Sequence, residues 1–275
     1  MTIASRRRIY WTFFVLACLS LAAAAFLSMP IFAKPTGLSA LVGADAYREI
    51  RIFRLEFDSV RASAFAVLLA ALYSTLCLAF VLASFRKTVS SEIFFFSFWV
   101  LSLALEAGRL LIFRFSAEGA PLSWTILATR VVLGARIVGL LAFFAAGLYA
   151  AGFRDEKLGT AVGFILVAGW AIAGAMPIDT GNYEPVLMLR PGYRDMATAL
   201  AVMAGLGTVL NLFHASFVSG EKAWRVASVG AALAFAGQFL VESQWHPAAI
   251  AVGAALLGVG SWLFVSRLHA YYLWQ

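Results

Sequence analysis

The chain has 275 residues, of which 63% are hydrophobic and 13% charged, and its formal net charge is +7. Soluble domains are about 45–50% apolar and about 25% charged, so this composition excludes a soluble globular protein. The basic residues are scattered among short segments and form no stripe with interleaved aromatic residues, which argues against a nucleic-acid partner. We expect a lipid bilayer as the surroundings instead.

The N-terminal segment begins Ser5-Arg6-Arg7-Arg8 and continues as an apolar run over residues 9–33. Basic residues before an apolar run are also typical of a cleaved signal peptide. This run has about 25 residues, however, against about 7–15 for the core of a signal peptide. It is long enough to cross a bilayer. We therefore expect an uncleaved first membrane helix.

Apolar runs of about 20 residues recur along the whole chain and mark membrane-spanning helices. The sequence predicts an all-α, polytopic integral membrane protein with one transmembrane domain over residues 1–275. The eight expected spans are 9–33, 61–85, 92–114, 123–153, 158–178, 196–218, 224–242 and 247–271. The break at His246-Pro247 is the shortest, so seven spans are the alternative.

Short matches recur in the same order in two halves of the chain, 9–153 and 158–273. Met29-Pro30-Ile31 ends the first span and Met176-Pro177-Ile178 ends the fifth. Such matches favour two parallel four-helix repeats, although apolar sequence of low complexity produces similar matches by chance. An even number of helices in each half excludes an inverted repeat of the common transporter type.

The orientation follows from the lysines and arginines of the short junctions, which gather on the cytoplasmic side. Every short junction on one side is basic, for example Arg86-Lys87 and Lys222. This pattern predicts a bacterial cytoplasmic (inner) membrane protein with both termini in the cytoplasm. The two longer loops, 34–60 and 179–195, are then on the outer side.

The two outer loops differ in pattern. In loop 34–60, the apolar residues Ile50, Phe53 and Phe57 fit a helix lying along the membrane surface, although part of the segment alternates like a strand. Loop 179–195 is rich in Pro, Gly, Asn and Tyr, and we expect it to be irregular.

Four charged residues lie inside apolar spans: Glu106 and Arg109 in the third, and Arg130 and Arg136 in the fourth. A charge at bilayer depth costs about 3 kcal/mol on insertion scales, so such residues are rare and usually functional. Glu106 and Arg109 share a helix face because they are three residues apart. If the two spans are antiparallel neighbours, Glu106 is level with Arg136, and Arg109 is roughly level with Arg130.

Two interpretations follow from this placement. In the structural one, Glu106 forms a buried ion pair with one arginine. In the functional one, the surplus positive charge binds an anion or a lipid headgroup. Glu242 of the seventh span would supply an acid, and Gln238 one turn away a hydrogen bond. The candidate ligand-binding residues are Glu106, Arg109, Arg130, Arg136, Gln238 and Glu242.

No other pattern indicates chemistry. The chain has no HExxH and no GxSxG motif, and His214, His246 and His269 are expected at different depths, so we predict no catalytic centre, metal site or cofactor. Cys18 and Cys77 lie far apart in apolar spans and are interpreted as packing residues.

These observations favour a non-enzymatic module that binds an anionic or lipidic ligand from the outer side, as a sensor or as an accessory part of a membrane protein complex. The alternative is a small transporter that uses the same site. A third hypothesis is a membrane enzyme acting on a lipid-linked substrate, with Glu106 or His246 as the acid/base.

Overall fold

The computed structural model describes residues 3–33, 49–52, 55–84, 90–153, 158–243 and 246–273. Within these residues, eight helical spans are long and apolar enough to cross a membrane, which confirms the polytopic all-α fold. The elements in chain order are α1 (Ile3–Ala33), β1 (Glu49–Ile52), β2 (Leu55–Asp58), α3 (Ser59–Ser84), α4 (Ser91–Ala104), η1 (Leu105–Ala107), α5 (Gly108–Ala117), α6 (Leu122–Ala150), α7 (Leu158–Ala175), β3 (Ile178–Glu184), β4 (Met188–Pro191), α8 (Arg194–Ser219), α9 (Lys222–Ser243) and α10 (Pro247–Leu273).

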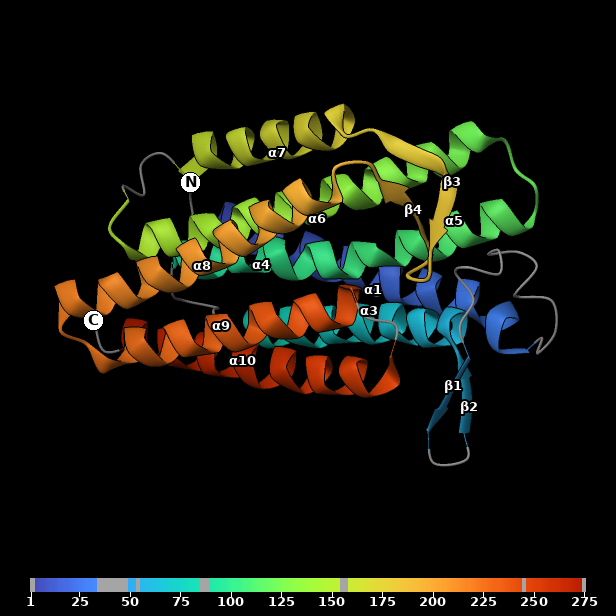
Figure 1. Ribbon diagram of the computed structural model, residues 1–275. Helices are drawn as coiled ribbons and strands as arrows, with labels where there is room; N and C mark the ends of the chain where they lie inside the picture. The colour runs from blue at the N-terminus through green and yellow to red at the C-terminus, as the bar shows by residue number, and fades with distance from the viewer. Residues whose placement is uncertain are drawn as a thin grey trace.

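The eight spans form one elongated bundle in which both termini lie at the same end (Figure 1). The two short hairpins, β1–β2 and β3–β4, lie at the opposite end, which we call the hairpin end. The third span consists of α4, η1 and α5 in succession. Pro247 begins α10, a helical position that suits proline, so the tight break before it does separate two spans.

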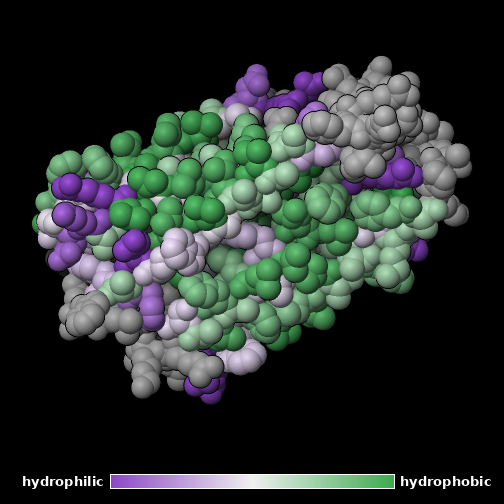
Figure 2. Space-filling view, turned by 90° about the horizontal axis from the view of Figure 1, so that it is seen from below, coloured by the Kyte–Doolittle hydropathy of each residue, from purple (hydrophilic) through white to green (hydrophobic). Residues whose placement is uncertain are grey.

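The interior of the bundle is built around α4 and α6, the helices of the two most buried spans. Their aromatic side chains interlock, and the rings of Trp99 and Phe143 stack with centroids 4.8 Å apart. At the periphery, α7 and α8 are the least buried spans and expose large apolar side chains such as Phe164 and Met203. On the face that Figure 2 shows, apolar side chains cover the middle of the molecule and hydrophilic ones gather toward its ends, as expected of a protein surrounded by lipid.

The surface helix expected in loop 34–60 is wrong for the part that the structure describes, because residues 49–52 and 55–58 pair as an antiparallel hairpin. The register sets Ile50 opposite Phe57 and Arg51 opposite Glu56. The alternation of apolar and charged residues along this segment is therefore the pattern that indicates its structure, and the weaker helical pattern is not. Residues 34–48, 53 and 54 lie outside the described residues.

The irregular loop expected over 179–195 is also wrong, because β3 and β4 form a second antiparallel hairpin with an irregular register between Asp179 and Tyr183. Its turn, residues 185–187, ends in Leu187, which has a φ of 63°. That conformation costs a non-glycine residue roughly 1–2 kcal/mol. It is maintained because the Leu187 side chain is completely buried among apolar residues of α1, α3 and α5. The turn therefore penetrates the bundle.

Candidate functional site

Glu106 lies where the third span changes from α-helical to 3₁₀-helical geometry, at Leu105–Ala107. A short 3₁₀ segment inside a helix often marks a strained or functional position. The side chain of Glu106 is only 1% exposed. A carboxylate that is buried to this extent needs cationic partners, and Glu106 has two, Arg136 and Arg109.

Glycine permits the close approach that brings the first partner. A Cβ at Gly139 of α6 would overlap the side chain of Ser102 of α4, and one at Gly108 would lie 2.7 Å from Cγ2 of Val132. The backbones of α6 and the third span can therefore approach closely, as small residues allow in membrane bundles. This approach lets Arg136 of α6 reach Glu106.

Arg136 binds Glu106 through two parallel hydrogen bonds. Its Nε donates to Oε1 over 2.6 Å, and its Nη2 donates to Oε2 over 2.6 Å. This bidentate geometry is the strongest that an arginine and a carboxylate form. The sequence predicted a buried ion pair between Glu106 and one arginine, with Arg136 at the same level in the adjacent span, and the structure confirms this ion pair with Arg136.

Arg109 is the second partner, and its main role was not apparent in the sequence. Its Nη1 donates to Oε2 of Glu106 over 3.3 Å, while its Nε donates to the carbonyl oxygen of Val186 over 2.6 Å. The neighbouring carbonyl of Pro185 accepts a hydrogen bond of 2.8 Å from Oγ of Ser63. Non-helical backbone at membrane depth must be satisfied by the protein. Arg109 and Ser63 thus anchor the inserted turn of the β3–β4 hairpin.

The second carboxylate of the cluster is Glu242 of α9. Its Oε2 lies 3.9 Å from Nε of Arg136, and its Oε1 accepts a hydrogen bond of 2.8 Å from Nε2 of Gln238. Gln238 in turn accepts a hydrogen bond of 2.5 Å from the indole of Trp99, which orients its amide. The third, fourth and seventh spans therefore converge on one polar cluster.

The structure brings five of the six candidate residues together and leaves Arg130 apart. Arg130 is exposed on α6, beside the exposed side chains of Leu127 and Val131. Within the cluster, the two arginines are balanced by Glu106 and Glu242. This arrangement does not bring Arg109 and Arg130 to a common anion, and the surplus charge inferred from the third and fourth spans is absent from the cluster.

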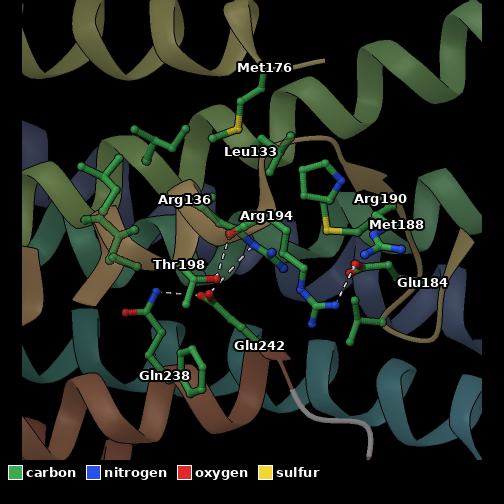
Figure 3. A pocket seen from close by; sticks show the side chains of 18 of the residues that line it. Leu133, Arg136, Met176, Glu184, Met188, Arg190, Arg194, Thr198, Gln238 and Glu242 are labelled. Carbon is green, nitrogen blue, oxygen red and sulfur yellow. Dashed lines mark hydrogen bonds and ion pairs between the residues drawn. The ribbon is translucent and has the colours of Figure 1, made fainter. Parts of the chain in front are cut away.

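A cavity of about 560 Å³ lies between α6, α8, α9 and the β3–β4 hairpin, with Arg136, Gln238 and Glu242 in its wall (Figure 3). Glu106 and Arg109 lie behind these residues and do not line the cavity. The apolar part of the wall comprises Leu133, Ile137, Leu140, Met176, Val186, Met188, Leu200, Phe235 and Phe239, among others. The cavity thus combines an extended apolar wall with a small number of charged groups, as is typical of ligand sites.

Three charged lining residues escaped the sequence analysis. Glu184, Arg190 and Arg194 belong to loop 179–195, for which the sequence analysis predicted only an irregular structure on the outer side. Arg194 is 56% exposed, and its Nη1 lies 3.5 Å from Oε1 of Glu184. The only available signal was the concentration of charge and proline in a loop that follows an apolar span.

Two ionisable groups of the hairpin have shifted pKa values. Burial raises the pKa of Tyr183 above its usual range, so its hydroxyl stays protonated at neutral pH. Hydrogen bonds from the amide of Asn182 and the N–H of Gly181 lower the pKa of Asp179. The Asp179 carboxylate therefore stays ionised and holds the irregular part of β3 in shape.

A second buried polar group lies near the opposite end of the bundle. Glu92 at the start of α4 accepts hydrogen bonds of 2.7 Å from Ser90 and 3.0 Å from Tyr272 of α10. Glu92 is the first residue of an expected span, and this position in the sequence did not indicate that its side chain is buried. These bonds join the first turn of α4 to the last turns of α10.

Fold and site together define a polytopic all-α membrane protein with a cavity at its hairpin end whose wall combines charged and apolar side chains. A scan against protein-family models gave no match, and neither the search of curated proteins nor that of solved structures found a significant one.

Proposed function

We propose that this protein is a non-enzymatic membrane module that binds an anionic amphipathic ligand, a lipid or a small organic anion with an apolar part, in the cavity beside Arg136. The proposal places the hairpin end on the outer side of a bacterial inner membrane and both termini in the cytoplasm, following the basic short junctions. The observation that carries it is a cavity in which apolar walls meet a surplus of arginine.

The charges of the cavity wall favour an anion. Three arginines and two glutamates line it, a difference of one positive charge, and the Glu106–Arg109 pair behind the wall adds none. A guanidinium has five N–H donors, and the bidentate contact with Glu106 uses two of them. Arg136 therefore retains donors for a ligand while it binds Glu106. Arg190 and Arg194 lie on the hairpin side of the cavity (Figure 3) and are exposed, so they are accessible to an anion that arrives from solution.

The apolar wall favours a ligand with a hydrophobic part. Leu133 and Met176 lie on one side of the cavity and Phe239 belongs to the α9 side, while the ion-paired groups occupy a limited part of the lining. An entirely polar anion would leave this apolar surface wet. An amphipath fills it, at about 25 cal/mol for each Å² of apolar surface removed from water.

Binding of octanesulfonate to the purified protein tests the proposal, with native mass spectrometry to identify any co-purifying anion. Octyltrimethylammonium and octyl glucoside are the cationic and neutral controls, and we expect only the sulfonate to bind. Replacing Arg190 of β4 and Arg194 of α8 together (Arg190→Gln, Arg194→Gln) should weaken binding about tenfold or more, since hydrogen bonds to charged groups contribute about 1.5–3 kcal/mol each. Arg130→Gln is the matched control and should leave the affinity unchanged. The proposal fails if the sulfonate does not bind, or if Arg130→Gln weakens binding as much as the double substitution does.

One observation supports the second candidate, a small transporter. The β3–β4 turn inserts among the helices, and irregular backbone at membrane depth occurs where it is buried in protein or lines a cavity, as in transporters. Flux of radiolabelled octanesulfonate into liposomes that contain the protein separates the candidates. Binding without flux identifies a binding module, and saturable flux identifies a carrier.

A further inference from the structure

We propose that the anion is bound together with one proton, which Glu242 accepts when the anionic head group takes its place beside Arg136. The inference rests on the proposed function and deepens it, because it makes the ligand site a coupled anion and proton site. It depends on the unequal ways in which Arg136 contacts its two carboxylates.

Glu106 and Glu242 are held with different strength. Glu106 receives three hydrogen bonds from two guanidiniums and is 1% exposed. Glu242 is 15% exposed, lines the cavity, and its Oε2 stays 3.9 Å from Arg136, which is beyond hydrogen-bond distance. Glu242 is therefore the carboxylate that a competing anion can displace from Arg136.

Charge balance then requires a proton. Without ligand, Arg109 and Arg136 balance Glu106 and Glu242. The surplus arginine charge of the cavity lies on the hairpin side, at Arg190 and Arg194, and not beside Arg136. An anion added beside Arg136 therefore makes three negative groups against two positive ones there, and an uncompensated charge in a poorly solvated site is costly. A proton taken from water onto Oε2 of Glu242 restores neutrality. No covalent bond of the protein breaks, and only the weak contact between Glu242 and Arg136 is lost.

Gln238 suits both protonation states of Glu242. Its Nε2 donates to Oε1 of Glu242, and Oε1 still accepts this bond when the proton is on Oε2. The bond from Trp99 to Oε1 of Gln238 keeps the amide in this orientation. A neutral Glu242 is thus already accommodated in its present position.

The other charged groups near Glu242 are unsuited to take the proton. Among the described residues, they are Arg136 of α6, Glu106 of η1, Arg109 of α5, Arg194 of α8, and Glu184 and Arg190 of the hairpin. Arginines keep their proton throughout the accessible pH range. Glu106 is bound by two of them, and Glu184 lies beside Arg194 at the hairpin. Glu242 remains as the acceptor.

Octanesulfonate is a suitable probe because it stays anionic at every pH used, so any pH dependence of binding arises in the protein. Calorimetric titrations between about pH 5 and pH 8, in buffers of different ionisation enthalpy, give the affinity and the protons taken up per bound anion. We expect an uptake that approaches one, and an affinity that falls by up to about tenfold per pH unit toward alkaline pH. Glu242→Gln should remove both effects while binding persists, and Glu118→Gln, an exposed carboxylate outside the cavity, should retain both.

The outcomes separate the two proposals. If octanesulfonate does not bind at any pH, the proposed function fails. If it binds to the parent protein with the same affinity at every pH and without proton uptake, the proton inference alone is wrong, and this measurement needs no variant. Persistence of the pH dependence in a folded Glu242→Gln protein would also overturn the inference.

Discussion

Removal of the Glu106 carboxylate should destabilise the protein more than any other single substitution in the polar cluster. Glu106 accepts bonds of 2.6, 2.6 and 3.3 Å from Arg136 and Arg109, and Glu106→Gln leaves both guanidiniums with Glu242 as their sole remaining acid in the cluster. Breaking a buried pair by removing one partner costs about 3–5 kcal/mol. We expect a loss of free energy of unfolding in that range.

The double substitution should recover much of this loss. Glu106→Gln with Arg136→Gln leaves Arg109 and Glu242, so the cluster is again neutral. Residues in direct contact show coupling energies of about 0.5–3 kcal/mol in double-mutant cycles, and a bidentate pair of this geometry belongs at the upper end. The double variant should therefore be about 2–3 kcal/mol more stable than the sum of the single changes predicts.

Unfolding by SDS in mixed micelles measures the coupling, and the buried Trp99 beside Gln238 provides the fluorescence signal. Arg114 and Glu118 form the matched control, because they make an ion pair of 2.7 Å on an exposed surface. Their coupling should not exceed about 0.5 kcal/mol. Equal coupling in the two cycles, or additivity at Glu106 and Arg136, would refute the assignment of the buried pair as the main electrostatic contact of the bundle.

Three further predictions concern topology, the hairpin and helix packing. In intact cells that express a cysteine-free variant, an impermeant thiol reagent should label a cysteine introduced at Asn182 but not one introduced at Gly220. Labelling of the cysteine at position 220 would mean that the proposed orientation is reversed. Arg109→Lys keeps the charge but loses the Nε donor to Val186, so hydrogen exchange in the β3–β4 turn should accelerate, and unchanged protection would mean that Arg109 does not anchor it. Gly139→Val should lower the free energy of unfolding by about 1–3 kcal/mol, because the new side chain meets Ser102. Gly159→Val is the control and should lower it little, because no atom lies within 4 Å of a Cβ at Gly159. Equal losses of stability would contradict the close packing of α4 and α6.

The sequence predicted the spans and the central ion pair because both depend on local regularities. Apolar length gives the spans, and the short connection between the third and fourth spans makes them antiparallel neighbours, which sets Glu106 opposite Arg136. Depth alone does not determine which way a side chain points. Arg130 and Arg136 are six residues apart on one helix, which separates them by about 120° around its axis. If Arg136 faces Glu106, Arg130 must face elsewhere, and the structure finds it exposed.

The cavity and the inserted hairpin were beyond the sequence because they depend on packing between distant segments. The turn residues Val186 and Leu187 are apolar within a polar loop, and that contrast was the available signal of their burial. No local pattern shows that Val186 meets Arg109, 77 positions earlier in the chain. Likewise, Glu242 reaches Arg136 only because α9 packs within the bundle. The net charge of the cluster could therefore not be predicted from the residues of the third and fourth spans alone.

Glu106 joins the two tasks of the polar cluster through a single carboxylate. Its Oε2 accepts from Arg109, which anchors the hairpin turn, and also from Arg136, which faces the cavity. Because the Nε of Arg109 is bonded to the turn, the β3–β4 hairpin and the arginine in the cavity wall are both anchored to one buried acid. The ion pair between Glu106 and Arg136 therefore stabilises the bundle and at the same time holds Arg136 in the wall of the cavity.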